Sequence, residues 1–313
     1  MSFTCYDIVV QTTGTTQTPL RIFQSQPPIT ERVELSSNLW IGPIPYEIDI
    51  VLSACEPRGL NYNPSRQYGY RYCFVREFET ETYPSYQWDE DRELQRLILL
   101  SRLVHPTTAS NHYSARLICK GGELEKIIPG PTQGFGAHAW VPTDDWRDWL
   151  TLEDIASLRE LLPKFIFTEL PVRIRRALHH FNYSQVSNSL DQRIAFVVTA
   201  FESMLKTARY DLSMQFKKRV VLLGALLQID ISESMAEQFY DDRSGYLHGS
   251  SSGWVNREQD AIHAYGRMEE LLRKSLIRAV AEPTFAAFFL TDANITAQFQ
   301  LSKNHTGRKA YNH

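Results

Sequence analysis

The segment of residues 189–208 constrains the fold most strongly, because it combines a helix start signal with a continuous helical pattern of apolar residues. Ser189 followed by Gln192 matches a capping box, in which two side chains satisfy backbone N–H groups at a helix start. The apolar positions then recur three and four residues apart: Ile194, Val197, Val198, Phe201, Met204, Leu205 and Ala208. Such a helix must bury its apolar stripe, so the segment predicts a helical core.

Neighbouring segments have similar patterns and predict that the second half of the chain is all-α. Further helices are expected over residues 152–167, 172–181 and 215–229, from Ser232 to the Gly/Ser run at 249–253, and over 257–281. The segment 215–229 is apolar on almost every side, which is typical of a helix at the centre of a bundle or shared with a partner subunit. Four apolar side chains after Pro283 are expected to fold back onto this bundle: Phe285, Phe288, Phe289 and Leu290.

The first 150 residues are rich in short strand-like runs bounded by Pro, Gly, Asn and Thr. These runs cover residues 5–10, 20–23, 39–44, 48–52, 68–78 and 114–119, and one helix is expected over 91–104. In the run 68–78, aromatic residues alternate with Arg71, Cys73 and Val75, which is typical of a two-faced strand. Aromatic and arginine side chains in alternation can also stack bases and hold phosphates, so both interpretations stay open.

Together these patterns predict an α+β multidomain protein. We expect a β-rich domain of unknown role at residues 1–145, an all-α domain built around a four-helix bundle at 146–301, and a tail at 302–313. A length of 313 residues is sufficient for two domains, each with its own core.

Charge and composition exclude several classes of function. The net charge is −3, with 13 basic against 18 acidic residues in positions 1–150 and 20 against 18 in the rest, so RNA would have to meet a local basic patch. No apolar run approaches the roughly 20 residues of a membrane span, and the N-terminus lacks an export signal, so we expect a cytoplasmic protein. The four cysteines are scattered and the histidine pairs lack metal-site spacing, so no metal or cofactor is expected.

The most function-like stretch is Asp241 to Gly249, which contains Arg243 and His248 at the expected end of a helix. An Arg-x4-His pattern alone has little weight, because it also occurs at Arg175 and at Arg308. The chemistry nevertheless suits RNA cleavage without a metal: histidine can move protons near neutral pH, and arginine offers fixed donors to phosphate oxygens. Five residues along an ideal helix turn about 140°, so either glycines loosen the last turn or each site draws its two residues from different subunits.

This stretch, the run from Asp191 to Leu205 and the apolar segment between them together resemble the HEPN superfamily, and within it the Apea-like branch. The resemblance covers about residues 171–281. It implies a four-helix bundle that dimerises so that the Arg-x4–6-His motifs of two subunits face one cleft, and many HEPN proteins are metal-independent ribonucleases.

Carried over residue by residue, the resemblance implies four site residues. Arg243 and His248 match the motif, Ser244 matches its polar position, where asparagine is usual, and Glu202 matches an acidic position on the first helix. In HEPN toxins silenced by nucleotide transfer, a tyrosine follows the histidine by two residues, and here that position is Ser250. The expected function is a homodimeric endoribonuclease of a toxin or anti-phage defence system, which leaves 2′,3′-cyclic phosphates.

Two basic clusters are candidates for binding the RNA backbone. One contains Arg175 and Arg176, next to Arg173, and the other contains Lys217, Lys218 and Arg219; ordinary solvated helix faces are the alternative. A second hypothesis for the whole protein is a non-catalytic HEPN-like dimerisation or interaction module. In this case Arg243 only pairs with Asp241, Asp242 or Glu202, and His248 only caps a helix. The N-terminal domain would sense a trigger or recruit a protein partner.

Overall fold

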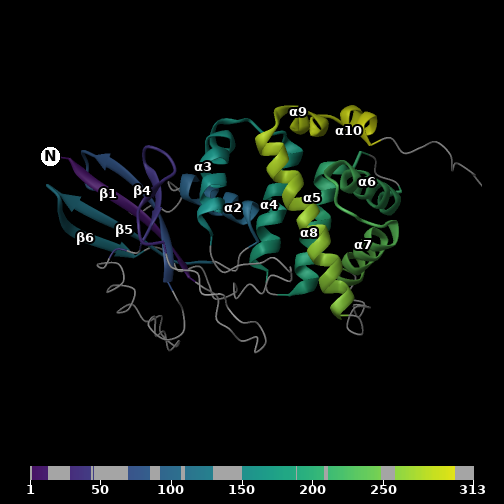
Figure 1. Ribbon diagram of the computed structural model, residues 1–313, viewed down its shortest axis with the longest axis horizontal. Coiled ribbons are helices and arrows are strands. Elements are labelled where there is room, and N and C mark those ends of the chain that lie inside the picture. Colours follow the sequence, from purple (N-terminus) through teal and green to yellow (C-terminus); the bar gives the residue numbers. More distant parts are fainter. Residues whose placement is uncertain are drawn as a thin grey trace, which may run out of the picture. The chain divides into compact units, whose positions relative to one another are not determined.

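The computed structural model describes residues 2–12, 29–43, 45, 70–84, 92–106, 110–129, 150–187, 189–207, 211–247 and 258–299. The chain divides into two compact units, Met1–Thr168 with Gln185–Asn188 and Glu169–Ser184 with Ser189–His313. The first unit contains an antiparallel sheet and two helices, and the second is helical (Figure 1), so the α+β expectation is confirmed at that level. The predicted domain boundary at residue 145 differs from this division, because α3 (Leu152–Phe167) packs on α2 (Arg92–Val104) and groups with the sheet.

The sheet has six antiparallel strands in the order β2-β3-β4-β1-β5-β6. Their bounds are β1 Phe3–Thr12, β2 Val33–Glu34, β3 Leu39–Gly42, β4 Tyr70–Thr80, β5 Ser110–Lys120 and β6 Glu123–Pro129. Four of the expected strand runs coincide with β1, β3, β4 and β5, whereas the runs at 20–23 and 48–52 lie outside the described residues.

Strand β6 was missed in the sequence, although a hairpin signal precedes it. Gly121 and Gly122 join β5 to β6, with φ angles of 59° and 87°. Positive φ at both central residues of a two-residue turn is the geometry that glycine adopts without strain, and it matches the twist of the flanking strands. The Gly121-Gly122 pair is therefore a clearer sequence signal for the β5–β6 hairpin than the residues of β6 themselves.

Both faces of the central strands are buried. Ile8, Trp40, Cys73, Val75, Ala115 and Leu117 form an apolar cluster on one face. On β4, Tyr72 and Phe74 alternate with the residues of this cluster and are also fully buried. The base-stacking alternative for this strand is therefore not supported for these two rings, because a base could not reach them.

The face of the sheet opposite the apolar cluster has a row of charged side chains. The antiparallel register sets Asp7 on β1 directly between Arg76 on β4 and Arg116 on β5. Arg116 donates from Nε and Nη2 to the two Asp7 carboxylate oxygens, the second contact being 2.7 Å. Arg76 Nη1 lies 3.9 Å from Asp7 Oδ2, and Arg76 Nε lies 3.2 Å from Oε2 of Glu93 on α2. This row of charged side chains therefore links the sheet to α2.

The second unit is built around four helices that all contact one another, α5 (Leu190–Leu205), α6 (Leu212–Leu227), α7 (Glu233–Leu247) and α8 (Glu258–Ala281). It also contains α4 (Val172–Val186), which is five residues longer than expected, and the short elements α9 (Pro283–Ala286), η3 (Ala287–Phe289) and α10 (Asp292–Gln298) (Figure 1). Ser189 and Ser232 cap α5 and α7, accepting from the backbone N–H groups of Gln192 and Met235. The predicted capping box at Ser189 is only half formed, because the return hydrogen bond from the Gln192 side chain does not occur among the described residues. Phe285 and Phe289 fold back and are buried, but Leu290 is exposed, contrary to expectation.

Candidate functional site

The arginine of the predicted motif lies beside the predicted acidic residue. Arg243 near the end of α7 donates from Nη2 to Oε2 of Glu202 on α5, at 3.4 Å. Side-chain exposures are 24% for Arg243 and 16% for Glu202, so the pair is half-buried rather than sealed in the core. Of the carboxylates considered as partners for Arg243, Glu202 is the one it contacts, across 41 residues of sequence.

Tyr240 completes this cluster one helical turn before Arg243. Its hydroxyl lies 3.5 Å from Oε1 of Glu202, and the Arg243 guanidinium lies 5.8 Å from the centre of its ring. Burial and then the Glu202 carboxylate raise the pKa of the Tyr240 phenol, so it remains a neutral donor. The single long contact to Glu202 occupies one of the five guanidinium N–H groups. Among the described residues Nε has no hydrogen-bond partner, but it is buried, so only the terminal nitrogens can offer donors to a ligand. Arg243 therefore retains donors for an oxyanion.

The other residues of the predicted motif are only partly covered by the structure. Ser244 follows Arg243 within α7 and is half-buried, whereas His248 lies outside the described residues. The helix continues through Leu247, so Gly245 does not open its last described turn. The structure thus brings Arg243 and Glu202 together and leaves the position of His248 untested.

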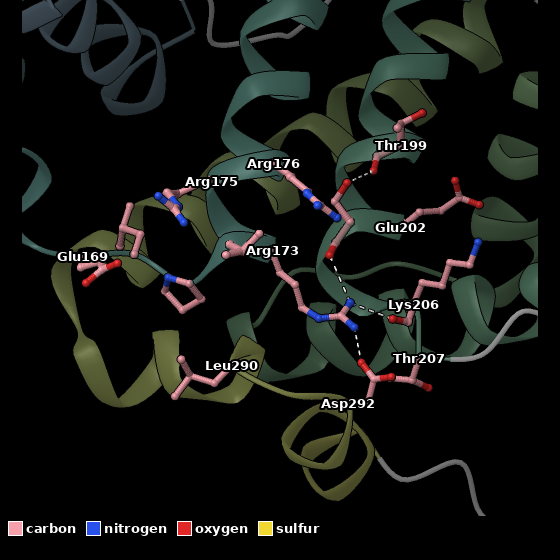
Figure 2. Close-up of a pocket in the computed structure, with 14 residues that line it drawn as sticks. Glu169, Arg173, Arg175, Arg176, Thr199, Glu202, Lys206, Thr207, Leu290 and Asp292 are labelled. Carbon is pink, nitrogen blue, oxygen red and sulfur yellow. Dashed lines mark hydrogen bonds and ion pairs between the residues drawn. The ribbon is translucent and has the colours of Figure 1, made fainter.

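Glu202 also lines a groove with a volume of about 1010 Å³. The start of α4 contributes Arg173, Arg175 and Arg176, and α10 contributes Asp292 (Figure 2). The last turns of α5 contribute Thr199, Glu202 and Ser203, and Lys206 follows at the helix end. The groove therefore collects four basic side chains from segments that are about 30 residues apart.

Arg173 has a structural role in this groove. Its guanidinium donates to the backbone carbonyls of Ser203 and Lys206, at 3.3 and 2.7 Å, and pairs with Asp292 (Figure 2). The last carbonyls of a helix have no partner within the helix, and an arginine supplies both hydrogen bonds and a favourable charge there. Arg173 thus ties the end of α5 to α10 and is not available to a ligand.

Arg175, Arg176 and Lys206 remain accessible cations. The two arginines are exposed, and across the described residues none of the three forms an ion pair or a side-chain hydrogen bond. Two of the three carboxylates in the groove are already paired, Glu202 with Arg243 and Asp292 with Arg173, which leaves Glu169. Permanently charged, unpaired guanidinium groups in an open groove suit an anionic ligand.

The second basic cluster predicted from the sequence does not form one surface. Arg219 is 3% exposed and donates to the backbone carbonyl of Leu205, to Thr207 at 2.9 Å and to Gln215 at 3.1 Å. Lys217 pairs with Glu237 at 2.7 Å, and Lys218 is half-buried without a described ion pair. Successive residues on a helix point about 100° apart, so three neighbouring basic residues cannot share one face. Arg219 is therefore not accessible to RNA.

Two further sequence-based expectations concern membranes and metals. No helix within the described ranges is both long and apolar enough to cross a bilayer. In the same ranges, no three His, Cys, Asp or Glu side chains are grouped as metal ligands.

Comparison with known proteins does not identify the family: no family model, no curated protein and no solved structure matches this chain. The HEPN resemblance therefore rests on the sequence motifs alone.

Proposed function

We propose that the protein is a metal-independent endoribonuclease of the HEPN type that acts as a homodimer. The observation that carries this proposal is the half-buried pair of Arg243 and Glu202, which joins the motif helix α7 to the wall of a groove containing free arginines. A site that holds one cation for the reacting phosphate beside other cations for neighbouring phosphates suits a polyanionic substrate.

In the proposed reaction a histidine and an arginine perform separate tasks. His248 takes the proton from a ribose 2′-hydroxyl, and the 2′-oxygen attacks the adjacent phosphorus. The bond to the 5′-oxygen breaks, and this oxygen takes a proton from water, while the proton on His248 is returned to solvent. The product strand ends in a 2′,3′-cyclic phosphate. Arg243 donates to the phosphate oxygens, on which negative charge builds up, and Glu202 and Tyr240 hold Arg243 in position.

The dimer is part of this proposal because of the helix geometry. Since α7 remains helical past Gly245, the explanation in which Gly245 loosens the final turn loses support. Arg243 and a residue five positions later on a regular helix would point about 140° apart. We therefore favour the arrangement in which Arg243 of one subunit meets His248 of the other.

The cellular context in this proposal comes from the HEPN resemblance. The enzyme would act in the cytoplasm as a toxin or anti-phage effector, and the sheet-containing unit would sense a trigger or bind a protein partner.

A second candidate function, a non-catalytic dimerisation or interaction module, is favoured by one specific observation. Arg243 is paired with Glu202, as expected if it only stabilises the bundle. The two candidates differ in the consequence of losing Arg243: the module predicts a loss of stability or assembly, and the enzyme predicts a loss of cleavage with the fold retained.

The test is cleavage of single-stranded RNA by the full chain in EDTA, with the product ends analysed for 2′,3′-cyclic phosphate. We expect Arg243→Ala and His248→Ala each to abolish cleavage while circular dichroism and dimer mass are unchanged. Cleavage that persists in both variants would reject the site, and an inactive wild-type protein would favour the module.

Mixing the two inactive variants tests the two-chain arrangement. If each site combines residues of two subunits, a heterodimer of Arg243→Ala and His248→Ala contains one complete Arg/His pair and recovers activity. If each site lies within one subunit, the mixture remains as inactive as its parts.

A further inference from the structure

An aromatic cluster lies beside the arginine groove, on the outer surface of α4 and α5. Tyr183 stacks on Phe196 with ring centres 5.4 Å apart and an interplanar angle of 23°. The His179 ring lies perpendicular to the Tyr183 ring with ring centres 4.7 Å apart, and His180 stacks on Phe196 with ring centres 6.4 Å apart. Tyr183 is 44% exposed, so Phe196 and His179 support a ring that still faces solvent.

The cluster follows the groove residues at helical spacing along both helices. On α4, Arg175 and Arg176 are followed at three- and four-residue steps by His179 and Tyr183, and all four side chains are exposed. On α5, Phe196 lies one turn before Thr199, which lines the groove. The eight residue steps from Arg175 to Tyr183 span about 12 Å of helix. That length matches three or four nucleotides at the roughly 3.4 Å spacing of a stacked strand.

The two ends of this strip offer different chemistry. The groove end has Arg175, Arg176 and Lys206 without described ion-pair partners. At the other end, burial and then the neighbouring His179 lower the pKa of His180, so its ring is uncharged at neutral pH and adds no cation. Cations with an adjoining exposed aromatic ring are the combination with which proteins bind single strands, because phosphates need charge and base faces need a flat apolar partner.

We propose that the outer face of α4 and α5 is a binding site for single-stranded RNA, with a base stacked on Tyr183 and phosphates held by Arg175, Arg176 and Lys206. A duplex would not suit it, because paired bases already stack on one another and present no free face to Tyr183. As the path of the substrate strand, this site rests on the proposed ribonuclease function; as a binding site, it can be measured without cleavage.

The binding test uses the full chain and a fluorescein-labelled, 2′-O-methylated oligouridine of about ten nucleotides, within the usual size of a single-strand site. This probe has no free 2′-hydroxyl and cannot be cleaved by the proposed chemistry. We expect Tyr183→Ala to weaken binding about tenfold, as for the loss of one base–aromatic stack, and Tyr183→Phe to bind like the wild type. Fluorescence anisotropy measures both dissociation constants.

Salt dependence separates the stacking end from the phosphate end. Replacing both Arg175 and Arg176 with alanine should reduce the slope of log K against log salt by about 1.4, because two phosphate contacts are lost at about 0.7 each. Tyr183→Ala should lower affinity at every salt concentration and leave the slope unchanged. Polyphosphate, which has no bases, should compete for the arginines and be bound equally well by the wild type and Tyr183→Ala.

Two substitutions elsewhere serve as matched controls. Tyr83 is an exposed tyrosine of the sheet-containing unit, 49% exposed, and Lys164 on α3 is a partly exposed cation that pairs with Glu160. Tyr83→Ala and Lys164→Ala should leave binding unchanged, and thermal unfolding should show that every variant is folded. The proposal is overturned if the wild type does not bind the probe, if Tyr183→Ala binds it as Tyr83→Ala does, or if a duplex of the same length binds more tightly.

A cleavage assay on the same variants keeps the two proposals apart. If Tyr183→Ala weakens probe binding as expected but the wild type does not cleave RNA, the RNA-binding site is retained and the ribonuclease function is rejected. Arg243-dependent cleavage with no effect of Tyr183→Ala on either binding or cleavage would retain the ribonuclease and reject this strand path.

Discussion

The two units each contain an arginine–carboxylate pair between distant segments, and the pairs differ in almost every other respect. In the sheet, Arg116 donates two hydrogen bonds to the Asp7 carboxylate, and the two side chains are 2% and 0% exposed. In the helical unit, Arg243 makes one contact of 3.4 Å to Glu202, and both side chains reach the surface. Fully buried charges have lost their contact with water and need close pairing with an opposite charge. Half-buried charges are still partly solvated, so a single long contact is tolerated.

The comparison suggests how to separate structural cations from functional ones in this protein. Arg116 and Arg219 are buried and donate to protein oxygens, and a ligand could not reach them, although the Nε of Arg219 has no hydrogen-bond partner in the part of the chain that the structure describes. Arg243 has spare donors, and Arg175 and Arg176 have no described partner at all. If accessibility and incomplete pairing mark function, substitutions of the first group should affect stability and those of the second should affect RNA handling.

The largest effect on stability is expected for Asp7→Ala. Removing one partner of a buried pair leaves Arg116 charged and uncompensated, which costs about 3–5 kcal/mol of unfolding free energy. Urea denaturation followed by circular dichroism measures it. Glu79→Ala, which changes an exposed carboxylate on β4, is the control and should stay within about 0.5 kcal/mol. Equal effects of the two substitutions would contradict the structural role of the pair.

A smaller but clear loss is expected for Arg219→Ala. The substitution leaves the Leu205 carbonyl and Thr207 without their charged donor, at a cost of about 1.5–3 kcal/mol. Its neighbour Lys218 provides the matched control, because Lys218→Ala should change stability by no more than about 0.5 kcal/mol. If Lys218→Ala were the more destabilising change, the assignment of Arg219 as the buried cation of this helix would be wrong.

Arg243→Ala sharpens the comparison most, because it separates stability from activity. We expect it to destabilise the protein by at most about 1 kcal/mol, as for other partly exposed ion pairs. Cleavage should fall about 100-fold or more, the usual consequence of removing a donor to a developing oxyanion. A stability loss as large as that of Asp7→Ala, with no RNA cleavage by the wild type, would instead support the interaction module.

The smallest effect concerns the pH dependence of stability at the aromatic cluster. Burial, with His179 adding to it, lowers the pKa of His180 in the folded chain. The unfolded chain, with a histidine pKa of about 6.5, therefore binds a proton more readily, so stability is full above about pH 6.5 and decreases as the pH falls below it. His180→Phe should reduce this decrease. An unchanged pH profile of the denaturation midpoint would show that His180 is not its source.

Features that depend on neighbouring residues were predicted well. The caps at Ser189 and Ser232 and the helices at 152–167, 190–205 and 258–281 follow from local hydrogen bonding and apolar periodicity. The pair of Gly121 and Gly122 carried an equally local signal for the hairpin before β6. That strand could have been predicted from the turn alone.

Features that depend on the environment of a side chain were predicted less well. Lys217, Lys218 and Arg219 are equivalent in the sequence, yet one is paired, one is half-buried and one is enclosed. Arg173 and Arg175 are two positions apart, and only Arg173 reaches the end of α5. The contribution of Lys206 to the groove and the support of Tyr183 by Phe196 had no local signal, because each requires a helix pair to be packed first.

The amino-acid sequence by itself determined where the helices begin, which faces they bury, and that Arg243 and Glu202 are the residues to examine. Capping and amphipathic spacing act over three or four residues, and they can be recognised without the rest of the chain. Only the tertiary structure decided which cations are accessible. A basic side chain stays accessible to a ligand unless distant segments place a carbonyl or carboxylate group next to it. Which groups lie next to it depends on the packing of α4, α5 and α7.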